Sequence, residues 1–96
     1  LILCVEAAGG PVRKPRGDHV ALSVAADGQF TLSPGVMSTG QGHETTLTRM
    51  VAGAFAVDEA RIAYFQGDST IQPEGRGNGG SSGLAVSGPA VAAAIA

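Results

Sequence analysis

Two glycine-rich loops are the features of this sequence best suited to bind a ligand. They span residues 40–42 and 79–82, and each runs toward a predicted helix. The N-terminus of a helix offers free backbone N–H groups and the positive end of the helix dipole, and glycine allows a ligand to approach the backbone closely. The side chains of Gln41, Ser81 and Ser82 add hydrogen-bond partners. We therefore expect an anion here, most simply phosphate or pyrophosphate. The alternative is that both loops only cap helices.

Two motifs near the second loop match catalytic sequences, but their surroundings do not. Residues 79–83 match G-x-S-x-G, the nucleophile elbow of hydrolases, with Ser81 as the nucleophile. An elbow directly follows a strand, whereas residues 73–78 are a poor strand, and no acidic residue follows Ser81. Residues 75–80 match G-x-G-x-x-G, but no acidic residue lies about 20 positions later. We expect neither a catalytic serine nor a Rossmann-type nucleotide site.

The histidines and the cysteine do not suggest a metal site or a catalytic pair. His43 and Glu44 are adjacent, so on a helix their side chains do not face each other, and no second His or Cys lies at ligand spacing. Cys4 is the single cysteine, which excludes an intrachain disulfide. It lies in the apolar segment 1–6, which we predict as a short buried strand. We therefore expect Cys4 to be a small core residue.

A β-hairpin is predicted as the first element that must position these loops. Apolar residues alternate with small or polar ones over 20–25 and again over 30–33. A three-residue loop with Gly28 in the left-handed conformation pairs Val24 with Phe30 and keeps both apolar rows on one face. A two-residue loop would put the two rows on opposite faces. We therefore predict a type I turn followed by a glycine bulge.

A helix is predicted from about His43, directly after the first loop. Glu44 lies in its first turn, where a carboxylate suits the positive end of the helix. Residues 61–66 are predicted as a strand, and a loop rich in Gly, Ser, Asn and Pro follows. In the final apolar helix, Pro89 is either the first residue or lies inside a helix that begins near Ser82. The apolar stripe of the first helix consists of Leu47, Met50, Val51, Ala54 and Phe55.

Taken in order, these motifs resemble the molybdopterin-binding subunit of the xanthine dehydrogenase, aldehyde oxidase and carbon monoxide dehydrogenase large-subunit family. The resemblance covers about residues 18–96, and its most specific part is Thr-Gly-Gln-Gly-His-Glu-Thr-Thr at 39–46. Gln-Gly-Asp-Ser at 66–69, Pro73 and the second loop then follow in the family's order. The sequence departs from the family pattern at Ser69, at Ser82 and Gly83, and at Pro89.

The resemblance implies an α+β fold. This fold is a two-layer α/β sandwich in which a small mixed sheet, including the β-hairpin, packs against two helices. Residues 1–96 would form a single domain or a fragment of a molybdenum-cofactor-binding domain. The implied cofactor is molybdopterin with molybdenum, in the cytosine dinucleotide form if the protein is bacterial. The residues that match the family's cofactor-binding loops are Gly40, Gln41, Gly42 and His43 in the first loop and Gly80, Ser81 and Ser82 in the second.

The resemblance also implies which functions lie outside this chain. The family's catalytic glutamate lies in a later segment, so we expect no catalytic residue here, and neither Glu44 nor Glu74 is the base. The pterin sulfurs hold the molybdenum, so no side chain here is an expected metal ligand. The implied partners are the rest of the molybdenum subunit and the iron–sulfur and flavin (FAD) subunits. Together they would form a cytoplasmic hydroxylase that oxidises aldehydes or N-heterocycles.

Composition and charge argue against some classes of protein. The 96 residues include 6 Lys+Arg and 8 Asp+Glu, a net charge of −2, which argues against a nonspecific nucleic-acid binder. Three of the basic residues lie in 13–16, which is either a solvated turn or an anion-binding loop. No apolar run approaches the ~18 residues of a membrane span.

Segments 1–5 and 91–96 are apolar, so we interpret the chain as a piece of a longer protein. The alternative function is a non-enzymatic small domain or truncated remnant that packs against a partner.

Overall fold

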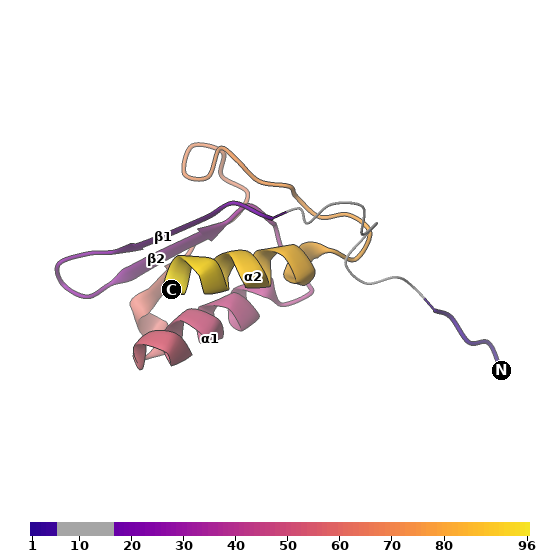
Figure 1. The fold of residues 1–96 in the computed structure, drawn as a ribbon, viewed down its shortest axis with the longest axis horizontal. Helices are drawn as coiled ribbons and strands as arrows, with labels where there is room; N and C mark the ends of the chain where they lie inside the picture. Colours follow the sequence, from indigo (N-terminus) through magenta and orange to yellow (C-terminus); the bar gives the residue numbers. More distant parts are fainter. Residues whose placement is uncertain (6–16) are drawn as a thin grey trace.

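A three-stranded mixed sheet with two helices on one face forms the fold, which confirms the predicted α+β class (Figure 1). The computed structural model describes residues 1–5 and 17–96. Strand order is β1-β2-β3, with β1 antiparallel and β3 parallel to the central β2. The elements are β1 (Val20–Val24), β2 (Phe30–Pro34), α1 (His43–Phe55), the 3-10 helix η1 (Glu59–Arg61), β3 (Ile62–Tyr64) and α2 (Gly83–Ile95).

The hairpin has the predicted register and loop. Val24 pairs with Phe30, and Gly28 has a φ of 79°. The backbone N–H of Gly28 donates to the carbonyl of Ala25 at 2.9 Å, which closes the turn. Phe30 therefore lies on the apolar face with the other inward residues of the sheet, as the left-handed glycine requires.

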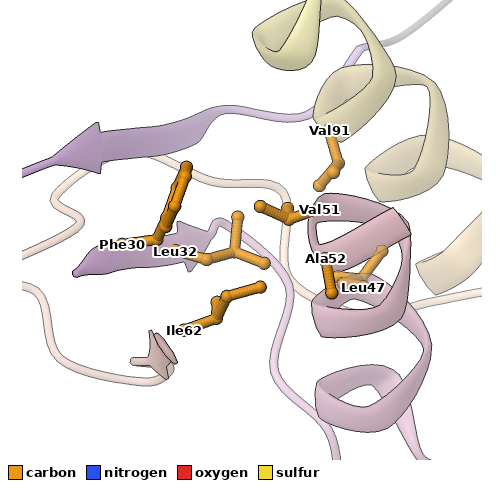
Figure 2. Close-up of a cluster of buried hydrophobic side chains, with 7 residues drawn as sticks. All are labelled: Phe30, Leu32, Leu47, Val51, Ala52, Ile62 and Val91. Carbon is orange, nitrogen blue, oxygen red and sulfur yellow. The ribbon is translucent and has the colours of Figure 1, made fainter. Parts of the chain in front are cut away.

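The core lies between the sheet and the two helices (Figure 2). α1 begins at His43 as predicted, but its buried face differs from the predicted stripe, because Thr48 and Ala52 are buried while Ala54 is exposed. α1 packs against both β3 and α2, so the second helix covers a side of α1 that a single stripe does not include. Phe55 is partly exposed, yet its ring lies 5.0 Å from that of Phe30. The core residues are Phe30, Leu32, Leu47, Val51, Ala52, Ile62 and Val91.

α2 begins early, which agrees with the second of the two predicted alternatives. Ser82 is the N-cap residue and Pro89 lies inside the helix. The polar side chain of Ser87 is buried, and its hydroxyl donates to the carbonyl of Gly83 at 2.8 Å. The residues exposed on this helix are Leu84, Ala85, Pro89, Ala92, Ala93 and Ala94. No helix of the described part is long and apolar enough to cross a membrane.

The prediction of a buried strand at residues 1–6 is wrong for the five that the structure describes. Residues 1–5 form no strand, are exposed and lie apart from the sheet (Figure 1). Cys4 is therefore exposed and is not a core residue. An apolar run becomes a strand only where it pairs with a neighbouring strand, and residues 1–5 pair with none of the three strands of the described sheet. The basic residues 13–16 lie outside the described residues.

The third strand is shorter than predicted. It spans Ile62–Tyr64 instead of 61–66, because Arg61 belongs to η1. The Arg61 guanidinium donates to the carbonyls of Asp27 and Gly28, at 2.7 and 3.1 Å. The end of η1 thus holds the hairpin loop, and the polar side chain at this position has a role outside the sheet.

Candidate functional site

The two parallel strands end at the same edge of the sheet, and both glycine loops extend from that edge. β2 leads into the first loop and α1, whereas β3 leads into segment 65–82 and α2. The two helices lie side by side and begin at the same end (Figure 1). Ligands of open sheets bind beyond the carboxyl ends of parallel strands. The topology therefore brings two loops that are far apart in the sequence to the edge of the sheet where ligands commonly bind.

The first loop depends on glycine for its conformation. Gly40 and Gly42 have φ values of 110° and 76°, and a Cβ at either position would meet no atom within 4 Å. The side chain of Gln41 folds back within the loop, where its Oε1 accepts from the backbone N–H of Thr39 at 2.5 Å and from the Thr39 hydroxyl at 3.2 Å. The loop thus has an internally held backbone with open space beside its glycines.

α1 begins without a side-chain cap. Its N-cap residue, Gly42, offers no side-chain acceptor, and the N–H of Thr46 is the first to bond within the helix, to the Gly42 carbonyl at 3.1 Å. No acceptor in the described part of the chain meets the N–H groups of His43, Glu44 and Thr45. A helix end with free N–H groups and a positive dipole attracts anions.

Gln66 anchors the first loop, although sequence reasoning did not single it out as a site residue. Its Oε1 accepts from the backbone N–H of Ser38 at 2.8 Å, and its Nε2 donates to the Ser38 carbonyl at 3.2 Å. Both polar groups of the side chain thus bond one residue just before the loop. In the sequence, Gln66 lies at the end of the predicted strand 61–66 and begins the Gln-Gly-Asp-Ser motif, and neither position identifies its hydrogen-bond partner.

The second loop has a strained backbone. Gly80 and Ser81 have φ values of 55° and 53°, a region that residues with a Cβ rarely adopt. Ser82 uses its side chain within the loop, because its hydroxyl donates to the carbonyl of Gly79 at 2.6 Å. It therefore gives α2 no side-chain cap. No strand lies within 65–82, so the strand and elbow of a hydrolase nucleophile do not occur around Ser81.

A close approach of two backbones attaches the second loop to the first. A Cβ at Gly35 would lie 2.5 Å from Cα of Gly75, and the N–H of Gly77 donates to the Gly35 carbonyl at 3.3 Å. The side-chain Nδ2 of Asn78 also donates to the carbonyl of Met37. Residues 75–78 therefore run against the chain that leaves β2, which fixes where the second loop begins.

His43 lies between the two loops. Its side chain is buried, with 5% exposure, and its Nδ1 has no hydrogen-bond partner in the described part of the chain. The ring faces Gly83, the first residue of α2, because a Cβ built on Gly83 would lie 2.5 Å from Cε1 of His43. This contact places His43, a predicted residue of the first loop, beside Gly83, which directly follows Ser82 of the second loop.

Acidic side chains also lie near this edge. Burial, and then the negative charges of Glu44 and Asp18, raise the pKa of Tyr64 to about 12. The Tyr64 hydroxyl, which has no hydrogen-bond partner in the described chain, therefore stays protonated well above neutral pH. Glu74 is exposed, and its carboxylate lies 3.1 Å from Nδ1 of His19. The described residues contain no cluster of three or more His, Cys, Asp or Glu that could hold a metal ion.

Comparisons with known proteins place this geometry among cofactor-binding proteins. A family model described as a molybdopterin cofactor-binding domain matches residues 1–96. The carbon monoxide dehydrogenase large chain of Hydrogenophaga pseudoflava is 30% identical over 77 residues, which cover 80% of this chain and 10% of that protein. The solved structure of reconstituted CO dehydrogenase from Oligotropha carboxidovorans superposes with a TM-score of 0.77 at 29% identity, covering 82% of this chain and 10% of that one. The chain spans about a tenth of the length of these relatives.

Proposed function

Because the chain belongs to the molybdopterin cofactor-binding domain family, we propose that its two glycine loops bind the phosphate-containing part of molybdopterin. One observation carries this proposal: two helix N-termini without side-chain caps begin side by side at the edge where the loops meet. Each N-terminus favours negative charge, and together they suit a ligand with more than one phosphate oxygen. The glycines leave space for such a ligand beside the backbone.

The described residues of the two loops offer hydrogen-bond donors that suit the phosphate oxygens of molybdopterin. The free N–H groups of residues 43–45 would hold phosphate oxygens at the start of α1. Gln41 uses its oxygen within the loop, so its Nε2 is the group left to donate to a ligand. Ser81 is exposed in the second loop and carries a hydroxyl on a strained backbone. When bound, the molybdenum–pterin group supplies the redox chemistry, while this chain supplies binding and orientation.

The activity of the whole protein is a further part of the proposal. The relatives that match this chain are carbon monoxide dehydrogenases, which supports a molybdenum-dependent oxidoreductase. We infer that such an enzyme acts on a small substrate, with aldehydes and N-heterocycles as candidates beside carbon monoxide. We also infer the cytosine dinucleotide form of the cofactor, iron–sulfur and FAD groups on partner subunits, and a cytoplasmic location.

The second candidate function, a packing module without a cofactor, is favoured by exposed apolar residues. Four of the first five residues, Leu1, Ile2, Leu3 and Val5, are large apolar residues with at least 87% exposure. The outer face of α2 is also apolar, and such faces commonly contact another protein surface. Concentration-dependent self-association of a cofactor-free chain, measured by sedimentation, would favour this function. Cofactor retention would favour the first.

A pair of variants at Gly42 tests the cofactor site. Asn and Asp have nearly the same shape, and both tolerate a φ near 76° better than most residues, so each should destabilise the fold by about 1 kcal/mol. Only Gly42→Asp adds a negative charge beside the free N–H groups. We expect Gly42→Asp to lower cofactor affinity at least about tenfold below Gly42→Asn, or about 1.4 kcal/mol.

The measurement is the molybdenum and pterin content of the full-length molybdenum subunit, together with its melting temperature. The melting temperature separates loss of cofactor from loss of fold. Equal and undiminished cofactor content in both folded variants would contradict a phosphate site at this loop.

A further inference from the structure

We propose that His43 is a positioning residue that sets the distance between the two cofactor-binding loops. Its imidazole fills the space between the first residues of α1 and α2, and it acts through its shape and not as a cofactor ligand. This inference rests on the proposed function, because the loops that it spaces are the proposed binding loops. If His43 acts in this way, cofactor binding depends on whether the side chains at positions 43 and 83 fit together.

The contact between His43 and Gly83 leaves no room for another carbon atom. A Cβ built on Gly83 would lie 2.5 Å from Cε1 and 2.9 Å from Nε2 of His43. Gly83 is absent from the glycines with positive φ, so its backbone conformation does not require glycine. Glycine within a helix is less favourable than alanine. The close approach of the His43 ring is therefore the physical reason for glycine at position 83.

The ring of His43 makes no hydrogen bond to another residue of the described part of the chain. Only 5% of His43 is exposed, and its Nδ1 has no hydrogen-bond partner in the described part of the chain. Leaving a buried polar atom unpaired lowers stability, whereas an apolar group of similar shape avoids that loss. If His43 acts as a spacer, leucine at position 43 should fill the same space, whereas alanine should leave a gap.

Asn78 completes the contact from the second loop. Its Oδ1 would lie 2.9 Å from the same Cβ built on Gly83, and its Nδ2 donates to the Met37 carbonyl. Met37 lies between β2 and the first loop, so Asn78 links the segment before one loop to the segment before the other. The His43 ring thus packs into a corner whose other sides are fixed, and its size determines how closely α2 begins to α1.

Size changes on the two sides of the contact test this role in the full-length molybdenum subunit. We expect Gly83→Ala to lower the molybdenum and pterin content about tenfold, and we expect the double variant His43→Ala with Gly83→Ala to recover most of it. Gly53→Ala is the matched control, because a Cβ there meets no atom within 4 Å and Gly53 lies on the exposed side of α1. That control should retain the wild-type content.

Two single variants distinguish spacing from ligation. His43→Leu should keep the cofactor and the melting temperature near wild-type values, whereas His43→Ala should lose cofactor. Loss of cofactor in a folded His43→Leu variant would show that a ring nitrogen binds the cofactor, and would overturn the inference. Full cofactor content in Gly83→Ala would also overturn it.

The Gly42 pair separates these failures from failure of the proposed function. If Gly42→Asp loses cofactor while every variant at positions 43 and 83 retains it, only the spacing role is wrong. If neither Gly42 variant nor Gly83→Ala changes the cofactor content, both the binding site and the spacing role are wrong.

Discussion

At individual positions, the glycines of this chain are required for different physical reasons. Gly40 and Gly42 have positive φ values, and open space surrounds the position of a Cβ. Gly83 has no positive φ, and its requirement comes from the neighbouring ring of His43. Gly28 combines both reasons. The consequence of adding a side chain therefore differs among these positions, from backbone strain alone to a collision with a fixed neighbour.

Gly28→Val should destabilise the fold by at least about 1 kcal/mol, because a β-branched residue tolerates positive φ poorly. A Cβ at this position would also lie 2.5 Å from Nη2 of Arg61, which holds the hairpin loop. The free energy of unfolding from chemical denaturation measures the effect. Gly17→Val is the matched control, since Gly17 has no positive φ and a Cβ there meets no atom within 4 Å. Equal stability of the two variants would contradict the argument.

Tyr64 should make stability fall as the pH rises from about 10 to about 12. Its pKa is about 12 in the fold, above the ordinary value of 10.0, because of burial and then the charges of Glu44 and Asp18. Between these two values the unfolded chain has lost the phenolic proton while the folded chain keeps it. Stability is therefore full below about pH 10 and falls as the pH approaches the folded pKa.

The absorbance of tyrosinate measures this titration directly, because the chain has one tyrosine and no tryptophan. The Tyr64→Phe variant should lose this contribution to the alkaline fall in stability. It should fold at neutral pH, since the hydroxyl has no partner in the described chain. A tyrosinate midpoint near the ordinary value in the folded chain would show that the site is not buried as described.

Among the elements, the first loop depends on a side chain from the end of another strand. Gln66 makes two hydrogen bonds to the backbone of Ser38, and this pair joins the residues that follow β3 to those that follow β2. A net contribution of about 1 kcal/mol for each hydrogen bond is typical. Because Ser38 lies two residues before Gly40, where the first glycine loop begins, this anchor restricts where that loop can lie.

Gln66→Ala should therefore lower the free energy of unfolding by about 1–2 kcal/mol and should reduce cofactor retention in the full-length subunit. Gln72→Ala is the control, because the Gln72 side chain donates to the nearby Glu74 carbonyl, at 2.5 Å, in an exposed hydrogen bond within its own segment. Hydrogen exchange at the Ser38 amide reports the loss of the anchor directly. Wild-type protection of that amide in Gln66→Ala would show that the loop is held by other contacts.

At the scale of the whole molecule, we expect the chain to form one side of a cofactor site. Both loops extend from one edge of the sheet, and the matched part of this chain covers 10% of each relative. We expect the 96-residue chain alone to show no oxidation of aldehydes, purines or carbon monoxide, even when it is supplied with cofactor. Assays of each substrate with an artificial electron acceptor measure this. Turnover above that of free cofactor would contradict the prediction.

The sequence by itself determined the features that depend on local pattern. The hairpin register followed from the alternation of apolar residues and from the left-handed Gly28, because a one-residue slip would move a whole row to the wrong face. The start of α1 at His43 and the two glycine loops could also be predicted from the sequence. Each of these features depends on neighbours within a few residues, and a single sequence records those neighbours directly.

Only the tertiary structure decided which distant residues meet. The burial of Thr48 and Ala52 depends on α2 packing beside α1, and the bonds of Gln66 depend on the parallel pairing of β2 and β3. The apolar pattern of residues 1–5 predicted burial, yet these residues are exposed, because a strand also needs a neighbour to pair with. The contact of His43 with Gly83 has the same origin. Periodicity along the chain specifies which side chains favour burial, whereas the packing of separate elements specifies what covers them.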